Sequence, residues 1–148
     1  MEEKKQRIYS SLENLCAKRE YCTSDIYRKA LDRLEGDSAA AEEMVAELVA
    51  DGFVSDLRYA SAFAREKASL TGWGPVKIRF ALSAKHIGSD VIDEALGEID
   101  TEKADARLER LIEAKRRSLE GDPQIRLKLI KFALSRGYDY DTVKKFVG

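Results

Sequence analysis

The chain has 148 residues, 36% of them charged and 44% hydrophobic, with a formal net charge of −1. This composition excludes a disordered chain, because a core burying about 70% of the unfolded surface is within its reach. It contains no apolar run of the roughly 20 residues that a transmembrane helix needs, no hydrophobic segment follows the start, and two cysteines are too few for a disulfide framework. We expect a cytoplasmic, helical protein that does not associate with membranes.

The first 54 residues are predicted to form three short helices. Apolar side chains recur at helical spacing over residues 9–20, and Thr23-Ser24 begins a second helix that ends near Leu34. The third predicted helix follows Ser38 and ends before Gly52. Its expected core stripe is Met44, Val45, Leu48 and Val49.

Residues 55–100 and 101–148 each repeat this three-helix scheme. Ser55 is a predicted N-cap for the first helix of the second unit, and Pro75 falls at the first position of the next helix, where a missing N–H costs nothing. Pro123 is predicted to do the same in the third unit. We therefore expect three units, over residues 1–54, 55–100 and 101–148.

An offset of 51 residues relates the second and third units. Ile78, Ile87 and Ile92 correspond to Leu129, Tyr138 and Val143 at this offset, and the turns align as well. The tetrapeptide Phe80-Ala81-Leu82-Ser83 also recurs, but at offset 52, and we interpret that identity as chance. A repeat of about 50 residues without a strand pattern predicts an all-α protein made of tandem three-helix repeats in an elongated, curved array.

Three segments resemble the RecX family. They are Asp51-Gly52-Phe53-Val54-Ser55-Asp56-Leu57-Arg58-Tyr59-Ala60, then Gly72-Trp73-Gly74-Pro75-Val76-Lys77-Ile78-Arg79, and finally Lys131-Phe132-Ala133-Leu134-Ser135-Arg136-Gly137-Tyr138. Their order and spacing follow the repeat, and the resemblance extends from about Leu12 to Val147. One departure lies at His86, where the family usually has a glycine in a Lys-Gly-Ile turn.

The resemblance implies a regulator of the bacterial recombinase RecA. By this resemblance, we expect a crescent-shaped protein that is suited to the groove of the helical RecA–DNA filament. In that groove, members of the family suppress filament growth, ATP hydrolysis and strand exchange, in DNA repair and the SOS response. It implies a non-enzymatic protein whose partner is the RecA filament. We also expect a monomer with weak DNA contact of its own, because a net charge near zero makes phosphate contact alone a poor source of affinity. No cofactor is expected, since the single histidine and the scattered hydroxyls form no recognisable catalytic or metal motif.

The basic residues of the last two units are the candidate partner-binding site. Net charge rises from −4 over residues 1–54 to +4 over residues 101–148. Lys77 and Lys128 are equivalent by repeat, as are Lys85 and Arg136, so stacked units would align them in a stripe. The other reading is an ordinary solvated helix surface. The candidate basic stripe comprises Arg65, Lys67, Lys77, Arg79, Lys85, Arg126, Lys128, Lys131 and Arg136.

Trp73 lies between two glycines in a loop, and we interpret it first as a core side chain that anchors the helix junction. The alternative makes it the candidate loop contact for the partner, because tryptophan is favoured at binding hot spots. The runner-up function is a helix-turn-helix protein that binds duplex DNA directly. The near-zero net charge and the acidic first unit oppose it. A scaffold for an unrelated protein is the third hypothesis.

Overall fold

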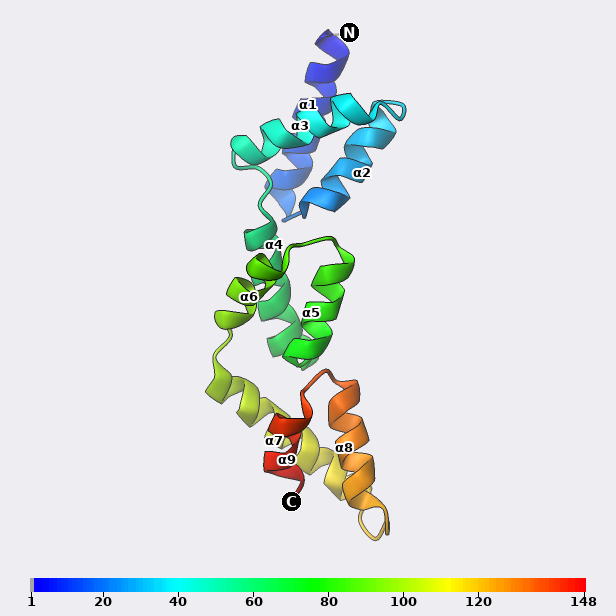
Figure 1. Cartoon of the computed structure of the whole chain (residues 1–148), viewed down its shortest axis with the longest axis vertical. Helices are drawn as coiled ribbons and strands as arrows, with labels where there is room; N and C mark the ends of the chain where they lie inside the picture. The colour runs from blue at the N-terminus through cyan, green and yellow to red at the C-terminus, as the bar shows by residue number, and fades with distance from the viewer. Residues whose placement is uncertain (1) are drawn as a thin grey trace.

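The computed structural model describes residues 2–148, which form nine α-helices, one short π-helical segment and no strand (Figure 1). This confirms the all-α prediction. The elements are α1 (Glu2–Lys18), α2 (Thr23–Arg33), α3 (Ser38–Ala50), α4 (Asp56–Glu66), η1 (Lys67–Thr71), α5 (Pro75–Ala84), α6 (Ser89–Gly97), α7 (Thr101–Ser118), α8 (Ile125–Ser135) and α9 (Tyr140–Val147).

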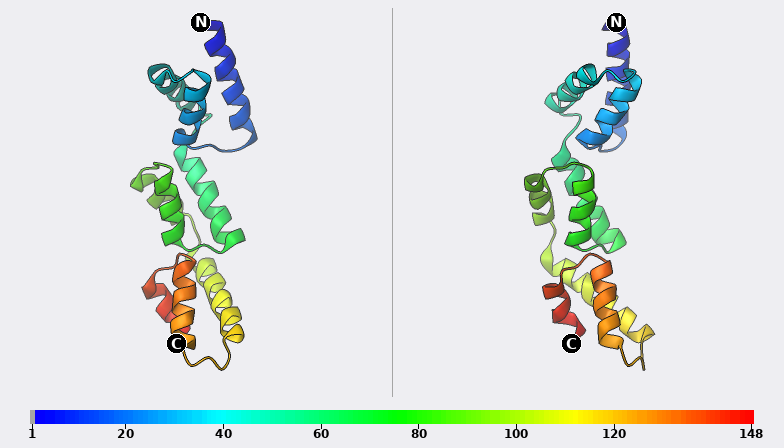
Figure 2. Two further views of the ribbon diagram at one scale, coloured as in Figure 1. Left: turned by 90° about the vertical axis from the view of Figure 1, so that its right-hand side faces the viewer. Right: turned by 45° about the vertical axis from the view of Figure 1, so that its right-hand side comes forward.

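The helices form three successive groups along one long axis, so the molecule is elongated (Figures 1 and 2). Helices α1–α3 lie at one end, α4–α6 in the middle and α7–α9 at the other end. Most helix–helix packing joins members of the same group, such as α2 with α3, α4 with α6, and α8 with α9. We refer to these groups as the first, middle and last units.

Each unit has its own apolar cluster. Leu12, Ile26 and Leu48 are fully buried in the first unit, while Leu108, Leu129 and Val143 are fully buried in the last. The middle cluster, around Ile78, Leu82 and Ile92, also includes Cys22, which belongs to the segment before α2. The buried Cys22 side chain therefore packs the first unit against the middle unit.

Val49 does not lie in the core as its helical spacing predicted. Its side chain is 46% exposed, whereas its neighbours Val45 and Leu48 are buried.

The start of α8 also differs from the prediction. Asp122 accepts a hydrogen bond from Gln124 N, so Pro123 lies in a turn and the helix begins two residues later, at Ile125.

The second helix of every unit ends in the same way, at positions that are 51 residues apart. The N–H groups of Gly36, Ile87 and Tyr138 donate to carbonyl oxygens five residues earlier, at Leu31, Leu82 and Ala133. The residues just before these donors have positive φ angles: 56° at Glu35, 62° at His86 and 94° at Gly137. All three helices thus end in the same left-handed turn, which supports offset 51 over the tetrapeptide match.

Helices α8, α5 and α2 stand end to end, and we call them the column (Figure 1). At the lower joint, Gly74 N donates to Arg136 O at 2.7 Å and Val76 N donates to Gly137 O at 2.8 Å. At the upper joint, Ser24 Oγ donates to Lys85 O at 2.7 Å. The residues at the start of α5 and of α2 thereby donate hydrogen bonds to carbonyl groups at the end of the helix below. The dipoles of the three helices align head to tail.

Candidate interaction surface

Trp73 lies where the middle unit meets the last. The π-helical segment η1 ends at Thr71, and the next residue, Gly72, has a φ of 73° that lets the chain turn sharply into the Trp73-Gly74 loop. The indole meets the Phe63 ring edge-on with centroids 6.2 Å apart, and Phe63 in turn stacks on Tyr59. Trp73 is half-buried against the middle core, so packing accounts for one side of the ring.

Two lysines of the predicted stripe stand over the same indole. Lys67 Nζ lies 4.9 Å from the Trp73 ring centroid and Lys77 Nζ lies 4.6 Å from it. They come from η1 and α5, on either side of the loop. Cation–π attraction of this kind contributes about 0.5–1 kcal/mol at exposed sites. The structure therefore joins Lys67, Lys77 and Trp73 into one positively charged aromatic group.

Lys85 and Arg136 occupy the two joints of the column. Lys85 Nζ pairs with Asp25 of α2 at 3.0 Å, and Arg136 Nη1 donates to Thr71 O at 3.5 Å. Burial alone would raise the pKa of Asp25, but hydrogen bonds from Lys85 and Cys22 lower it below its usual value. Both cations thus have partners in the neighbouring unit and help to hold the units together.

The other predicted cations lie on exposed parts of their helices. Arg79 pairs with Asp93 of α6 at 2.6 Å, and Lys128 pairs with Asp122 at 2.5 Å. Arg65, Arg126 and Lys131 are exposed, and no ion pair within 4.0 Å is found for them among residues 2–148. These three cations of the predicted set are therefore exposed and not engaged in an ion pair among the described residues.

The sequence analysis did not predict a second aromatic ring that lies under two cations. Lys115 Nζ lies 5.4 Å from the Phe132 ring centroid, and the Arg136 guanidinium lies 5.2 Å from it. The three residues come from α7, α8 and the turn after α8. Sequence spacing gave no signal for this group, because Lys115 and Phe132 meet only when α7 packs against α8.

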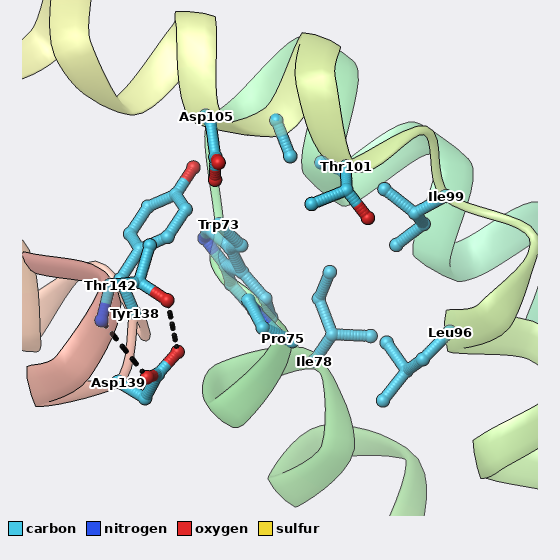
Figure 3. A pocket seen from close by; sticks show the side chains of 12 residues that line it. Trp73, Pro75, Ile78, Leu96, Ile99, Thr101, Asp105, Tyr138, Asp139 and Thr142 are labelled. Atoms are coloured by element: carbon cyan, nitrogen blue, oxygen red, sulfur yellow. Dashed lines mark hydrogen bonds between the residues drawn. The ribbon is translucent and has the colours of Figure 1, made fainter. Parts of the chain in front are cut away.

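A cavity of about 150 Å³ lies beside Trp73 at the joint of the middle and last units (Figure 3). Apolar side chains such as Ile78, Leu96 and Ile99 line it on one side, while Tyr138 and Asp105 face it from the last unit. Its lining carries two carboxylates, Asp105 and Asp139, and Asp139 is already occupied as the N-cap of α9.

Among residues 2–148 no cluster of three metal-binding side chains occurs. No helix in that range is long and apolar enough to cross a membrane.

The fold is that of an all-α repeat protein, with cations and aromatic rings along stacked three-helix units. The middle unit matches the family model "RecX, second three-helix domain" over residues 55–96. The regulatory protein RecX of Chromohalobacter salexigens is 35% identical over 135 residues, which cover 88% of this chain and 84% of that relative. The chain belongs to the RecX family of regulatory proteins.

Two further similarities differ in how much they cover. A regulatory protein RecX of Clostridium botulinum is 35% identical over 99 residues, or 64% of this chain, and the match spans about half of the relative (46%). The crystal structure of RecX from Lactobacillus salivarius superposes with a TM-score of 0.87 at 19% identity, covering 99% of this chain and 96% of that one. This superposition shows that the two proteins share the fold.

Proposed function

We propose that this protein binds the RecA–DNA filament and regulates the recombinase, mainly by inhibiting its ATP hydrolysis and strand exchange. The observation that carries the proposal is that equivalent cations occur on two stacked helices. Lys77 of α5 and Lys128 of α8 correspond at offset 51, and the two helices follow one another directly in the column. The chain's place in a family of regulatory proteins supports a regulatory role.

The repeat architecture favours a partner that is itself repetitive. Stacked units offer similar contacts at regular intervals along an extended surface, which a helical filament of identical subunits can meet several times at once. We place the main contact on Lys77, Lys128 and Lys131, with Trp73 beside them, because Lys85 and Arg136 bind groups of the neighbouring unit and so hold the units together. The pair of Lys128 with Asp122 lies within the last unit, at the start of α8. Near-zero net charge makes phosphate contact alone a weak source of affinity, so DNA contributes a minor share.

The protein acts in this proposal without catalysis and without a cofactor, as a cytoplasmic monomer. It lowers recombinase activity by occupying the filament. Inhibition is then an equilibrium effect, which scales with the fraction of filament sites that are covered and reverses on dilution.

The test is single-stranded-DNA-dependent ATP hydrolysis by the cognate RecA, titrated with this protein. We expect suppression at well below one regulator per recombinase subunit, because one elongated molecule contacts several subunits. No effect at stoichiometric excess would contradict the regulatory function and leave only the fold and family assignment.

A parallel binding assay on duplex DNA alone separates the proposal from direct DNA recognition. A helix-turn-helix protein that makes 6–10 phosphate contacts loses about a thousandfold or more in affinity between 50 and 200 mM salt. We expect weak binding to free duplex and a filament affinity that depends much less on salt. Tight, steeply salt-dependent binding to duplex without RecA would favour the alternative.

A further inference from the structure

Helices α5 and α8 differ from the rest of the chain in charge. Among the nine α-helices of residues 2–148, only these two contain no Asp or Glu. Together they hold five cations, and they follow each other in the column. At a rise of 1.5 Å per residue, the two helices together are about 30 Å long. Neither helix carries a carboxylate side chain, although acidic residues are abundant elsewhere in the chain.

The same two helices expose large apolar side chains. Phe80 is 78% exposed and Val76 54% on α5, while Leu127 is 48% and Leu134 42% exposed on α8. Val76 and Phe80 are separated by one helical turn. Leu127 and Leu134 are separated by two, with exposed Lys131 between them.

These exposed residues face away from the core of each unit. On α5 the fully buried side chains are Ile78 and Leu82, which point toward α4 and α6, so Val76 and Phe80 occupy the opposite side. Leu127 corresponds to Val76 and Lys131 to Phe80 at offset 51, so the same side of α8 is exposed. We call Val76, Phe80, Leu127, Lys131 and Leu134 the column face.

Basic side chains border the column face on one edge. Lys77 and Lys128 are equivalent in the repeat and lie one residue after Val76 and Leu127, about 100° around each helix. Lys128 also pairs with Asp122 at 2.5 Å, while Lys77 lies over the Trp73 ring. Exposed apolar side chains grouped on one side, with lysines beside them, mark a docking surface rather than a solvated helix.

We infer that the column face binds an amphipathic segment of the recombinase itself, one that carries carboxylates beside its apolar residues. This inference rests on the proposed function and names the chemistry of its contact. Apolar side chains of the segment cover Phe80 and Leu127, and its carboxylates lie along Lys77, Lys128 and Lys131. The contact is therefore with protein, at a surface whose charge complements the column.

Nucleic acid fits the column face less well than protein. Phosphate oxygens gain nothing from contact with Val76, Leu127 or Leu134, because these aliphatic side chains offer no hydrogen-bond donor. Phe80 alone could stack on a base. Binding a protein segment buries all four apolar side chains and uses the lysines at the edge, so it accounts for both properties of the surface.

The first experiment is a cross-link from the column face. We place p-benzoylphenylalanine at position 80 and form the complex with RecA filaments on single-stranded DNA. The control carries it at Tyr140, an aromatic side chain of α9 that is 48% exposed and lies off the column face. We expect position 80 to cross-link to a recombinase peptide with Asp or Glu near apolar residues, at much higher yield than position 140.

The second experiment reports the sign of the partner's charge at one site. Leu127→Lys and Leu127→Glu both lose the apolar side chain and place charges of opposite sign at the same position. We expect the lysine variant to bind the filament at least about tenfold more tightly than the glutamate variant, and Phe80→Ala to weaken binding about tenfold. Tyr140→Ala should bind as the wild type does.

Several results would overturn the inference. A cross-link from position 80 to DNA alone, equal yields from positions 80 and 140, or equal affinities of the two Leu127 variants would each do so. These failures are distinct from failure of the proposed function, which would appear as a wild-type protein that binds no filament at all.

Discussion

Gly74 and Gly137 meet backbone to backbone where α5 follows α8. A Cβ atom on Gly74 would lie 2.5 Å from the carbonyl carbon of Gly137, and a Cβ on Gly137 would overlap the Lys77 side chain. The two glycines therefore allow the hydrogen bonds from Gly74 N and Val76 N that close the joint between the middle and last units. Side chains at either position would separate helices that now continue each other.

The first prediction concerns this joint. Gly137→Ala should destabilise the protein by about 2 kcal/mol or more, because φ is 94° there and the new Cβ would lie 2.8 Å from Lys77 N. Urea unfolding, followed by the fluorescence of the single tryptophan beside the joint, measures the loss. Gly97→Ala is the control, since nothing lies within 4 Å of its Cβ. Equal stability of the two variants would contradict the tight contact.

The second prediction concerns His86, which occupies the position of Gly137 one repeat earlier. Its φ of 62° is unfavourable for a residue with a side chain, and its side chain is exposed. His86→Gly should therefore stabilise the protein by up to about 1 kcal/mol, a rise in Tm of about 2–4 °C. Thermal unfolding by circular dichroism measures the shift. Ser83→Gly, inside the same helix, should lower Tm instead, and a drop with both variants would argue against strain at His86.

The third prediction is a pH dependence at the upper joint. Because the Asp25 pKa is lowered in the folded state, its pair with Lys85 stabilises the fold above about pH 3.9, and this contribution is lost as pH falls through the folded-state pKa. The hydrogen bond to Asp25 raises the Lys85 pKa, so its contribution holds below about pH 10.4 and is lost as pH rises further.

Asp25→Asn should therefore lower stability at pH 7 by less than about 1 kcal/mol, since the pair is partly exposed. The variant and the wild type should become equally stable near pH 2. Urea unfolding at pH 7, 4 and 2 measures the difference. A gap between the two proteins that persists at pH 2 would show that the substitution acts through packing rather than charge.

The fourth prediction concerns the basic stripe. Reversing Lys77, Arg79, Lys128 and Lys131 to Glu should abolish filament binding, because these four residues supply most of the positive charge of α5 and α8. Helicity should be retained, because Arg79, Lys128 and Lys131 are exposed and Lys77 is only half-buried. Fluorescence anisotropy of labelled single-stranded DNA coated with RecA measures binding. Reversal of three cations on α1, Lys5, Arg7 and Lys18, is the control and should leave affinity within about twofold. Unchanged binding by the folded column variant would refute the stripe.

The fifth prediction separates the two roles considered for Trp73. Trp73→Ala should cost about 2 kcal/mol, roughly half the loss for a fully buried tryptophan, because one side of the ring packs on Phe63. Trp73→Phe keeps most of this packing and should remain folded. If the exposed side contacts the partner, Trp73→Phe binds the filament more weakly at unchanged stability. Full affinity of that variant would assign Trp73 to structure alone.

The helices and their apolar faces could be predicted from the sequence because they depend on local spacing. Ile78, Leu82 and Ile92 recur as Leu129, Ala133 and Val143, and all six are buried. Ser55 caps α4 through Arg58 N as its residue type predicts. Val49 was misplaced because helical periodicity identifies an apolar face but not the point where packing against the next element ends.

The sequence by itself determined the all-α class, the 51-residue repeat and the residues equivalent within it, since these follow from periodicity and turn chemistry along one chain. Only the tertiary structure decided which cations remain available. Lys85 and Arg136 are equivalent to each other in the repeat, as Lys77 and Lys128 are. Yet Lys85 and Arg136 lie at joints, where residues 60 to 65 positions away supply their partners. Those contacts depend on how one unit is set on the next. No local pattern encodes that geometry, because it arises from the meeting of surfaces far apart in the chain.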